Sequence, residues 1–305
     1  MNNSEEKRLN KKNRSVLFMA RELLFSKVGE RIAPVTEYSE KYGISVGLIQ
    51  RAFVLLQNEG AIKLDKRGVL GSFVKEINNE ILLEKSDLGF LVGVMPLPYS
   101  KRYEGLATGI KNNFQNYNLN YYFAYMSGSG VRLNLLRNGI YDFAVVSKLA
   151  YEIERERNGD IESVFEFGAK SYVSKHVLLK APGVKKIVKI GVDRNSEDQK
   201  FLTKEFLGDS NYEFVEIDYN ETLKLLENKI VDGIIWNYDE IEEKSIKMEY
   251  DELPENKILK KANEAVLVIS RRNDNLRKLS RKIIDVDYIR EIQQKVLTNQ
   301  ILPTY

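Results

Sequence analysis

The sequence predicts a multidomain protein in which a small helical N-terminal domain with a β-hairpin wing precedes a larger, bilobal α/β domain. Three observations lead to this fold class. The segment 14–76 contains helix signals followed by a glycine-flanked hairpin. From residue 88 onward, short apolar runs alternate with amphipathic stretches. A second, similar series of runs begins near residue 184, which divides the larger domain into two lobes.

The helices of the N-terminal domain are indicated by apolar residues at three- and four-residue spacing. One such pattern covers residues 15–28 and predicts the first helix. A second, shorter helix follows Pro34, with Thr36 as its expected cap. The tight turn at 42–44 separates it from a third helix, which Ser45 is expected to cap. This order of elements is typical of a helix-turn-helix, here followed by a wing.

The third helix is predicted to turn one face toward the core and the other toward DNA. Its apolar residues recur on one face: Leu48, Ile49, Ala52, Phe53, Leu55 and Leu56. The expected DNA-binding residues lie near its start and on the basic wing: Ser45, Val46, Gly47, Gln50, Arg51, Lys63, Lys66 and Arg67. Glutamine pairs best with adenine and arginine with guanine, so Gln50 and Arg51 are the candidate base-reading side chains.

The third helix and the wing together resemble the DNA-binding domain of the GntR family. In that family the helix ends L-x-x-L-x-x-E-G-x-I and the wing has the pattern G-x-G-T-[FYW]-V. This chain supplies the matching residues in the same order: Phe53, Leu56, Glu59, Gly60, Ile62, Gly68, Gly71, Ser72, Phe73 and Val74. One extra residue separates the wing glycines, and Val46 and Gln50 occupy positions where family members commonly carry arginine. The resemblance implies operator DNA as a partner but not the operator sequence.

The composition indicates a folded protein with a mildly basic N-terminal part. Hydrophobic residues make up 43% of the chain and aromatic residues 10%, which is enough to build a core. Residues 1–80 contain 14 Lys and Arg against 10 Asp and Glu, whereas the remainder contains 33 against 34. A surplus of this size fits phosphate contacts, especially if a dimer doubles it, and also fits an ordinary solvated basic face.

The absence of cysteine and the nature of the first residues bear on the compartment. Without cysteine the chain can form no disulfide, no thiolate metal site and no thiol nucleophile. Residues 1–13 are polar and mixed in charge, so we expect a mobile tail there rather than a signal peptide or a membrane anchor. We therefore expect a cytoplasmic protein with no membrane contact, cofactor or metal.

The larger domain is expected at 88–305, after a linker at 77–87. We predict a first lobe of about 88–183 and 258–305, and a second lobe of about 184–257. The predicted strands are 88–95, 119–126, 142–147 and the returning 265–270 in the first lobe, and 186–192, 212–217 and 233–236 in the second. Because helices separate most of these strands, parallel pairing is expected. Trp236 is expected in the second-lobe core or at the lobe boundary, and His176 on a strand near the crossover.

The return of the chain to the first lobe resembles type 2 periplasmic-binding-protein domains. Together with the N-terminal module, this organisation looks like the YhfZ family of proposed transcriptional regulators. The resemblance implies a ligand-responsive, DNA-binding protein, which we expect to be a homodimer. It does not name the ligand.

A ligand is expected beyond the carboxyl ends of the strands, where helices begin. The candidate ligand-binding residues lie on these loops: Tyr99, Ser100, Ser127, Gly128, Ser129, Gly130, Ser147, Arg194, Asn195, Ser196 and Asn237. The loop 127–130 suits a carboxylate or phosphate, because glycine allows close backbone approach and serine donates hydrogen bonds. Ordinary helix capping by Ser129 is the alternative. Arg194 is the candidate clamp for an oxyanion, or else a solvated arginine paired with Glu197 or Asp198.

The motif content favours a regulator over an enzyme. The chain has a single histidine and no G-x-S-x-G motif, P-loop or dinucleotide-binding glycine motif. We expect a cytoplasmic transcription regulator that binds operator DNA as a homodimer and senses a small, anionic metabolite. Two alternatives stay open. One is a small-molecule sensor whose helix-turn-helix serves protein association, and the other is a substrate-converting enzyme of the same bilobal fold.

Overall fold

The computed structural model describes residues 3–88, 90–208 and 212–305. These residues cluster into two compact units. The first comprises Met1–Leu91, Phe114–Tyr121 and Lys278–Ile283, and the second comprises Val92–Asn113, Tyr122–Arg277 and Ile284–Tyr305. Among the described residues, every helix is too short or too polar to cross a membrane.

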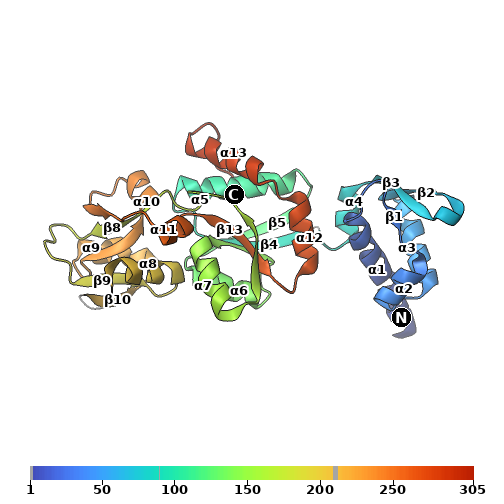
Figure 1. The fold of residues 1–305 in the computed structure, drawn as a ribbon, viewed down its shortest axis with the longest axis horizontal. Helices are drawn as coiled ribbons and strands as arrows, with labels where there is room; N and C mark the ends of the chain where they lie inside the picture. Colours follow the sequence, from blue (N-terminus) through green and yellow to red (C-terminus); the bar gives the residue numbers. More distant parts are fainter. Residues whose placement is uncertain (1–2, 89, 209–211) are drawn as a thin grey trace. The chain divides into compact units, whose positions relative to one another are not determined.

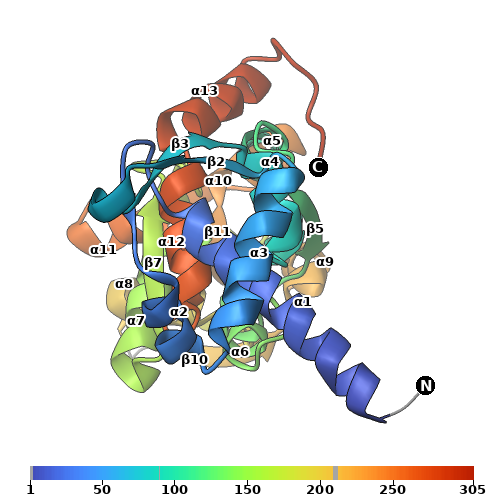
Figure 2. The same cartoon turned by 90° about the vertical axis from the view of Figure 1, so that its right-hand side faces the viewer.

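The N-terminal domain consists of helices with a small antiparallel sheet at one end (Figure 2). Its elements are α1 (Asn3–Leu24), β1 (Arg31–Ile32), α2 (Val35–Tyr42), α3 (Val46–Asn58), β2 (Ile62–Lys66), η1 (Gly68–Leu70), β3 (Ser72–Ile77) and α4 (Asn79–Lys85). The strand order is β1-β3-β2, and β2 and β3 form the wing. Helices α3 and α4 both pack on α1. Ile49, Ala52 and Leu56 of α3 are buried together with Met19 and Leu23 of α1, as the helical spacing of apolar residues predicts.

The turn between α2 and α3 depends on Gly43. This residue has a φ of 61°, a left-handed conformation that glycine adopts without steric cost. The Ser39 hydroxyl closes the turn by donating to the Ile44 carbonyl at 2.6 Å. Helix α2 begins directly after Pro34, so the expected cap at Thr36 lies inside the helix. Proline fits this position because it has no N–H that would need a partner.

The structure places the start of the N-terminal domain differently from the sequence prediction. Helix α1 begins at Asn3, so most of the segment 1–13, expected to be a tail, is helical. Met1 and Asn2 lie outside the described residues. The segment is rich in Glu, Lys and Arg, which have good helix propensity even without an apolar face. At its other end the helix stops at Leu24, four residues earlier than expected.

The segment 77–87, expected to be a linker, contains helix α4. The Asn78 side chain caps this helix by accepting from the backbone N–H groups of Glu80 and Ile81. Leu82 and Leu83 are buried, so the short helix belongs to the core of the N-terminal domain.

Lobe 1 of the larger domain is a five-stranded sheet with helices on both faces (Figure 1). Its elements are β4 (Phe90–Met95), α5 (Lys101–Gln115), β5 (Asn120–Tyr125), α6 (Ser129–Arg137), β6 (Phe143–Ser147), α7 (Lys148–Asn158), β7 (Ile161–Glu166), β13 (Ala265–Ser270), α12 (Asp274–Ile283) and α13 (Val286–Leu297). The strand order is β5-β4-β6-β13-β7. Strands β4 and β6 are parallel, as predicted, whereas the returning β13 is antiparallel to both neighbours. Gly89, in the predicted first strand, lies outside the described residues.

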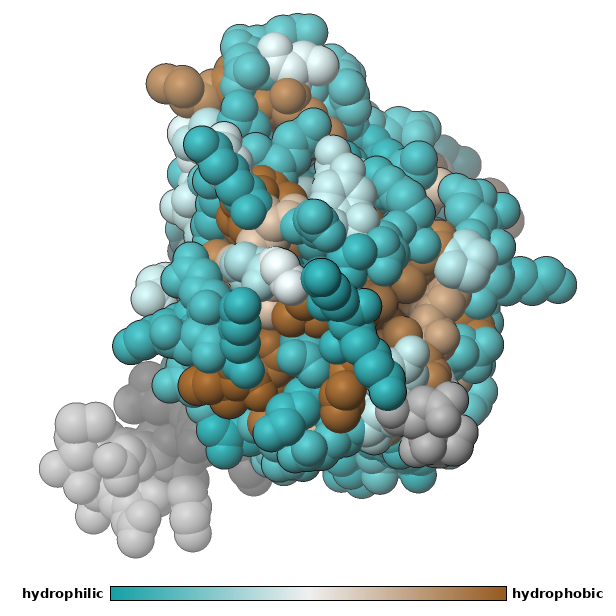
Figure 3. Space-filling model, turned by 90° about the vertical axis from the view of Figure 1, so that its left-hand side faces the viewer, coloured by the Kyte–Doolittle hydropathy of each residue, from teal (hydrophilic) through white to brown (hydrophobic). Residues whose placement is uncertain are grey.

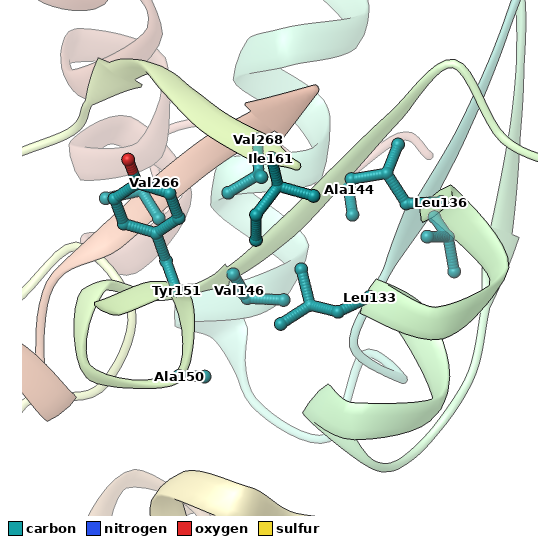
Figure 4. Close-up of a cluster of buried hydrophobic side chains, with 10 residues drawn as sticks. Leu133, Leu136, Ala144, Val146, Ala150, Tyr151, Ile161, Val266 and Val268 are labelled. Carbon is teal, nitrogen blue, oxygen red and sulfur yellow. The ribbon is translucent and has the colours of Figure 1, made fainter. Parts of the chain in front are cut away.

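The packing of the lobe 1 core explains why strands such as β6 have a continuous apolar sequence. On one face of the sheet, Ala144 and Val146 of β6 and Val266 of β13 pack against Leu133 and Leu136 of α6 (Figure 4). All five residues of β6 are buried, because helices cover both faces. A strand of this kind has a continuous apolar sequence instead of an alternating one.

Lobe 2 is a second five-stranded sheet, with the order β10-β9-β11-β8-β12. Its elements are β8 (His176–Lys180), β9 (Lys189–Asp193), α8 (Glu197–Leu207), β10 (Glu213–Ile217), η2 (Tyr219–Glu221), α9 (Thr222–Glu227), β11 (Gly233–Asn237), α10 (Tyr238–Glu243) and β12 (Tyr250–Glu252). Strand β9 is parallel to β10 and β11, whereas β8 is antiparallel to β11 and β12. Because β8 pairs within this sheet, lobe 2 begins near residue 176 rather than at 184. Hydrophilic residues predominate on the face of this lobe seen in Figure 3.

The two lobes share a small apolar cluster beside their own cores. Leu149 of α7 in lobe 1 packs with Leu202 of α8 and Ile235 of β11 in lobe 2. Leu259 and Ala262 complete this cluster from α11 (Lys257–Ala262), the helix that leads the chain back to lobe 1. The lobes are therefore joined by packing as well as by the two chain crossings.

Gly93 in β4 provides a test of the lobe 1 core. A Cβ at this position would lie 2.2 Å from the Phe143 ring, so Gly93→Ala should lower the free energy of unfolding by about 1–3 kcal/mol through overpacking. Denaturant unfolding monitored by circular dichroism measures the effect. In the double variant with Phe143→Leu the smaller side chain should absorb part of the added volume. Strictly additive losses in the double variant would show that this contact is not the cause.

Candidate functional site

The first candidate site is the exposed face of α3. Gly47, Gln50 and Arg51 are exposed there, Ser45 is exposed at the helix start, and Val46 is half-buried. Among the residues whose side chains the structure describes, 13–88, 90–208 and 212–305, none forms an ion pair or a side-chain hydrogen bond with Gln50 or Arg51. These two side chains are therefore free to contact a partner, which is the condition for reading base edges in a major groove.

The basic residues of the wing are exposed but partly engaged. Lys63 pairs with Glu76 at 2.6 Å, and Arg67 pairs with Asp65 at 2.7 Å while its guanidinium lies over the Phe73 ring. Lys66 is exposed as well. Exposed ion pairs of this kind contribute little to stability, so phosphate groups can replace the carboxylates at low cost.

The second candidate site is a cleft between lobe 1 and lobe 2. It has a volume of about 90 Å³. Since one water needs roughly 10–15 Å³ on this measure, the cleft has room for several waters or a small molecule. It is lined by Pro96, Leu97, Tyr99, Tyr103, Ser127, Gly128, Ser129, Arg132, Tyr172, His176, Asp193, Ser196, Asp198, Gln199, Tyr219, Ile234, Ile235, Trp236 and Asn237.

One wall of the cleft is a stack of aromatic rings from both lobes. Tyr99 of lobe 1 stacks on Tyr219 with 4.6 Å between ring centroids, and Tyr219 stacks on Trp236 at 4.2 Å. The Tyr99 hydroxyl donates to Asn220 at 2.9 Å, and Tyr219 donates to Glu240. Burial raises the pKa of Tyr99 to about 12, so its hydroxyl stays protonated at neutral pH. The wall offers a flat apolar surface to a ligand.

Arg132 supplies the positive charge of the cleft. Only 2% of this residue is exposed. Its guanidinium donates from Nη1 to the Met126 carbonyl at 2.8 Å and from Nη2 to the Tyr172 hydroxyl at 2.9 Å. Arginine stays charged when buried, because its pKa lies far above neutral. The ionised carboxylate of Asp198 lies close enough to interact with this cation.

Three buried donors of the cleft have no acceptor. Arg132 Nε, Trp236 Nε1 and Asn237 Nδ2 are inaccessible to solvent, and no described residue accepts a hydrogen bond from any of them. The Oδ1 atom of Asn237 is already used, since it caps α10 by accepting from the Asp239 N–H at 3.0 Å. Buried donors in native proteins are nearly always paired, so these three residues of the cleft have hydrogen-bonding capacity that a ligand or ordered water can use.

The acidic groups of the cleft differ in environment. Asp193, 3% exposed, accepts from the Asn195 N–H at 2.9 Å, and burial raises its pKa. Burial acts in the same direction on Asp198, but hydrogen bonds from Ser147, Ser196 and Ser129 and the charge of Arg132 outweigh it and lower the pKa of Asp198. Asp198 is therefore ionised at neutral pH.

His176 lies at the back of the cleft, at the first residue of β8. Its Nδ1 is 2.8 Å from Asn263 Oδ1, and burial lowers its pKa. The imidazole is therefore neutral at neutral pH, and Nδ1 must carry the proton that is shared with the amide oxygen.

The structure brings together most of the predicted ligand-binding residues. Those that line the cleft are Tyr99, Ser127, Gly128, Ser129, Ser196 and Asn237. Gly130, Ser147 and Asn195 instead form contacts between the lobes: the Gly130 N–H donates to the Asn195 carbonyl at 3.1 Å, and Ser147 donates to Asp198 at 2.5 Å. Ser100 is buried before α5 and, among the described residues, is not one of those that line the cleft.

Arg194 is the predicted ligand-binding residue that the structure moves away from the cleft. Its side chain is 54% exposed and forms a bidentate pair with Asp218, not with Glu197 or Asp198. The loop 193–196 does reach the cleft, but consecutive residues point in different directions. Asp193 and Ser196 face inward, and Arg194 faces solvent.

Arg132, and not Arg194, is the arginine that lines the cleft, and the sequence contains a signal for it. In α6 the buried residues are Ser129, Arg132, Leu133 and Leu136, which have the spacing i, i+3, i+4 and i+7 of one helix face. An arginine on the apolar face of a helix that begins with a glycine-serine loop is a candidate for a buried, paired cation.

Comparison with known proteins finds a matching family model for each of the two domains. A family model described as the YhfZ C-terminal domain matches residues 78–305, and a helix-turn-helix domain model matches residues 27–74. The chain is 36% identical over 289 residues to the protein YhfZ of Escherichia coli (strain K12), an alignment that covers 94% of this chain and 95% of that protein.

Solved structures show the same fold. The crystal structure of YhfZ from Shigella flexneri matches with a TM-score of 0.64 and 35% identity, covering 74% of this chain and 98% of that chain. The periplasmic aliphatic sulphonate binding protein SsuA from Escherichia coli matches with a TM-score of 0.52 and 11% identity, covering 69% and 75%. These matches confirm the predicted fold class, a helix-turn-helix domain followed by a periplasmic-binding-protein-like domain. The chain therefore belongs to the YhfZ family.

Proposed function

We propose that this protein is a cytoplasmic transcription regulator that binds operator DNA as a homodimer and senses a small anionic metabolite in the interlobe cleft. The observation that carries the proposal is the cleft itself, in which a buried arginine and two further donors lack an acceptor. An anionic ligand in this cleft has acceptor oxygens that can pair with these donors, the Arg132 guanidinium among them. The helix-turn-helix domain supports DNA as the other partner.

Coupling between the two activities requires that the metabolite bind one conformation more tightly than another. A difference of about 1–3 kcal/mol is enough for visible regulation. Closure of the lobes around the ligand is the expected change, because both lobes contribute residues to the cleft. A homodimer would present two helix-turn-helix domains to two half-sites of an operator.

We also propose that the protein binds its ligand without converting it. Asp193 and Asp198 are the carboxylates that line the cleft, and His176 is neutral and held by Asn263. Asp198 is saturated with hydroxyl donors, which leaves it poorly suited to proton transfer. Incubation with an identified ligand should return it unchanged, and any turnover would favour the enzyme alternative.

DNA binding is tested first with Arg51→Ala. The variant should lose about 10- to 100-fold in affinity for the upstream DNA of its own gene, because a side chain that contacts a base edge contributes roughly 1–3 kcal/mol. Fluorescence anisotropy at two salt concentrations, with unrelated DNA as competitor, measures specific affinity and its salt dependence. Arg194→Ala, which removes an exposed but paired arginine of lobe 2, is the matched control.

The same titration distinguishes the two hypotheses for the helix-turn-helix, DNA binding and protein association. Specific, salt-sensitive binding by the native protein, reduced by Arg51→Ala alone, supports the regulator. If the folded protein binds DNA only nonspecifically, the association-module alternative becomes the better one. Size-exclusion chromatography with light scattering then determines whether the chain self-associates.

The anion site is tested with Arg132→Lys. Lysine keeps the charge beside Asp198 but lacks the Nε donor and the planar fork, so affinity for an anionic ligand should fall at least about 10-fold. A panel of small carboxylates, phosphates and sulfonates can be screened by the fluorescence of Trp236, the only tryptophan, which lines the cleft. Sulfonates are included because the structurally similar SsuA is named for them.

Arg194→Lys is the matched control for this substitution, since it makes the same change on the exposed arginine. It should bind the selected anion like the native protein. Equal weakening by both substitutions would show that the loss of affinity does not arise at Arg132. Tight binding of neutral compounds, with none of the anions bound, would contradict the anionic assignment.

A further inference from the structure

The carboxylate of Asp198 belongs to lobe 2 but is bound largely by lobe 1. Its Oδ1 accepts from the Ser129 hydroxyl at 2.8 Å, and its Oδ2 accepts from the Ser147 hydroxyl at 2.5 Å. Ser196, in the same loop as Asp198, donates to Oδ1 at 2.7 Å. Two of these three hydroxyl donors therefore come from the opposite lobe.

The lobe 1 side of this contact is arranged as an oxyanion site. Ser129 is the first residue of α6, and Ser147 is the N-cap of α7. Both are buried, with at most 2% exposed, and Arg132 follows one turn into α6. Two helix N-termini thus direct their partial positive charge toward one point, next to a buried cation. The site combines backbone dipoles, hydroxyl donors and a full charge, which is the chemistry that a carboxylate requires.

The neighbouring backbone shows that the lobes meet closely at this point. Gly128 has a φ of 80°, and a Cβ on it would lie 2.6 Å from Asn195 Cβ. The Gly130 N–H donates to the Asn195 carbonyl. On α8, Leu202 lies one turn after Asp198 on the same face and packs in the apolar cluster shared by the lobes. The carboxylate contact therefore lies within a continuous interface between the lobes.

We propose that Ser129, Ser147 and Arg132 form a carboxylate-binding site of lobe 1, and that the chain's own Asp198 is its resident ligand. This contact lowers the free energy of the closed cleft relative to the open one even without a metabolite. The orphaned donors of Trp236 and Asn237 are not used by this contact, so a metabolite binds beside Asp198 and does not replace it. The inference goes beyond the proposed function, because it requires neither DNA nor an effector.

The ionisation of Asp198 sets the pH range of this contact. Its pKa in the folded protein is lowered below the ordinary value near 4. A group with a lowered pKa stabilises the folded state at pH values above its unfolded pKa, and the stabilisation is lost as the pH falls through the lowered pKa. The contact is therefore fully formed at neutral pH.

The test removes the Asp198 carboxylate by substitution and then adds a free carboxylate ion to the solution. Asp198→Ala leaves space for formate, the smallest carboxylate. The chain contains no cysteine, so Glu156→Cys on α7 and Lys204→Cys on α8, both exposed, allow spin labels to be placed on the two lobes. Pulsed electron spin resonance on the full chain then measures the distance between the lobes. Asp198→Ala should broaden this distance and shift it to longer values, and formate should restore it saturably.

Three controls accompany the distance measurement. Chloride at equal ionic strength should not restore the distance, and Asp218→Ala, which removes an exposed carboxylate of lobe 2, should leave it unchanged. Gly128→Ala should open the cleft by steric clash and provides a reference for the opened state. The melting temperature of Asp198→Ala should fall by about 5–15 °C and recover with formate.

The proposal fails if Asp198→Ala leaves the distance unchanged, or if formate and chloride act alike. Asp198→Asn preserves the shape but removes the charge, and covers the case in which the alanine variant does not fold. Partial opening of the asparagine variant supports the proposal, and a native distance in that variant overturns it. None of these outcomes depends on DNA or effector binding, so failure here is distinct from failure of the proposed function.

Discussion

The contact of Asp198 with two serines of the other lobe is the interaction on which the cleft depends. Ser129 and Ser147 lie at the starts of α6 and α7, so one carboxylate joins two helices of lobe 1 to α8 of lobe 2. A carboxylate that has lost hydration stays charged only where other donors replace water. Each donor therefore supports the others, and the positions of the three helices are mutually dependent.

Electrostatics also explains how Arg132 is tolerated in the closed cleft. Its guanidinium donates to a carbonyl and to Tyr172, and the charge of Asp198 offsets its own. One of its donors nevertheless lacks an acceptor, as do those of Trp236 and Asn237. Each such donor costs roughly 1–3 kcal/mol. Polar groups in a structural core are normally satisfied, so a concentration of unsatisfied donors in one cavity is typical of a binding site.

The parts of the fold that local pattern determines were predictable from the sequence. Strands β6 and β11 have continuous apolar runs because both of their faces are covered, and the Gly43 turn has its usual signal. Strand β12 is exposed at every residue, so only its pairing with β8 defines it. In the site, the loops were predictable because strand ends meet in such folds, whereas the direction of Arg194 was not. The burial of Arg132 depends on packing between segments that are distant in the sequence. Its position on the apolar face of α6 was nevertheless a local signal for burial.

The unsatisfied donors bear on the energetics of the proposed regulation by a ligand. In the closed cleft no described residue accepts a hydrogen bond from Arg132 Nε, Trp236 Nε1 or Asn237 Nδ2. A ligand that accepts from them in the closed form stabilises that form, and hydrogen bonds of this kind contribute roughly 0.5–3 kcal/mol each. Reversing a conformational equilibrium from 1:99 to 99:1 needs about 5.5 kcal/mol. The donors can therefore supply the energy of a switch, while Asp198 keeps the closed form near enough in energy for a small ligand to select it.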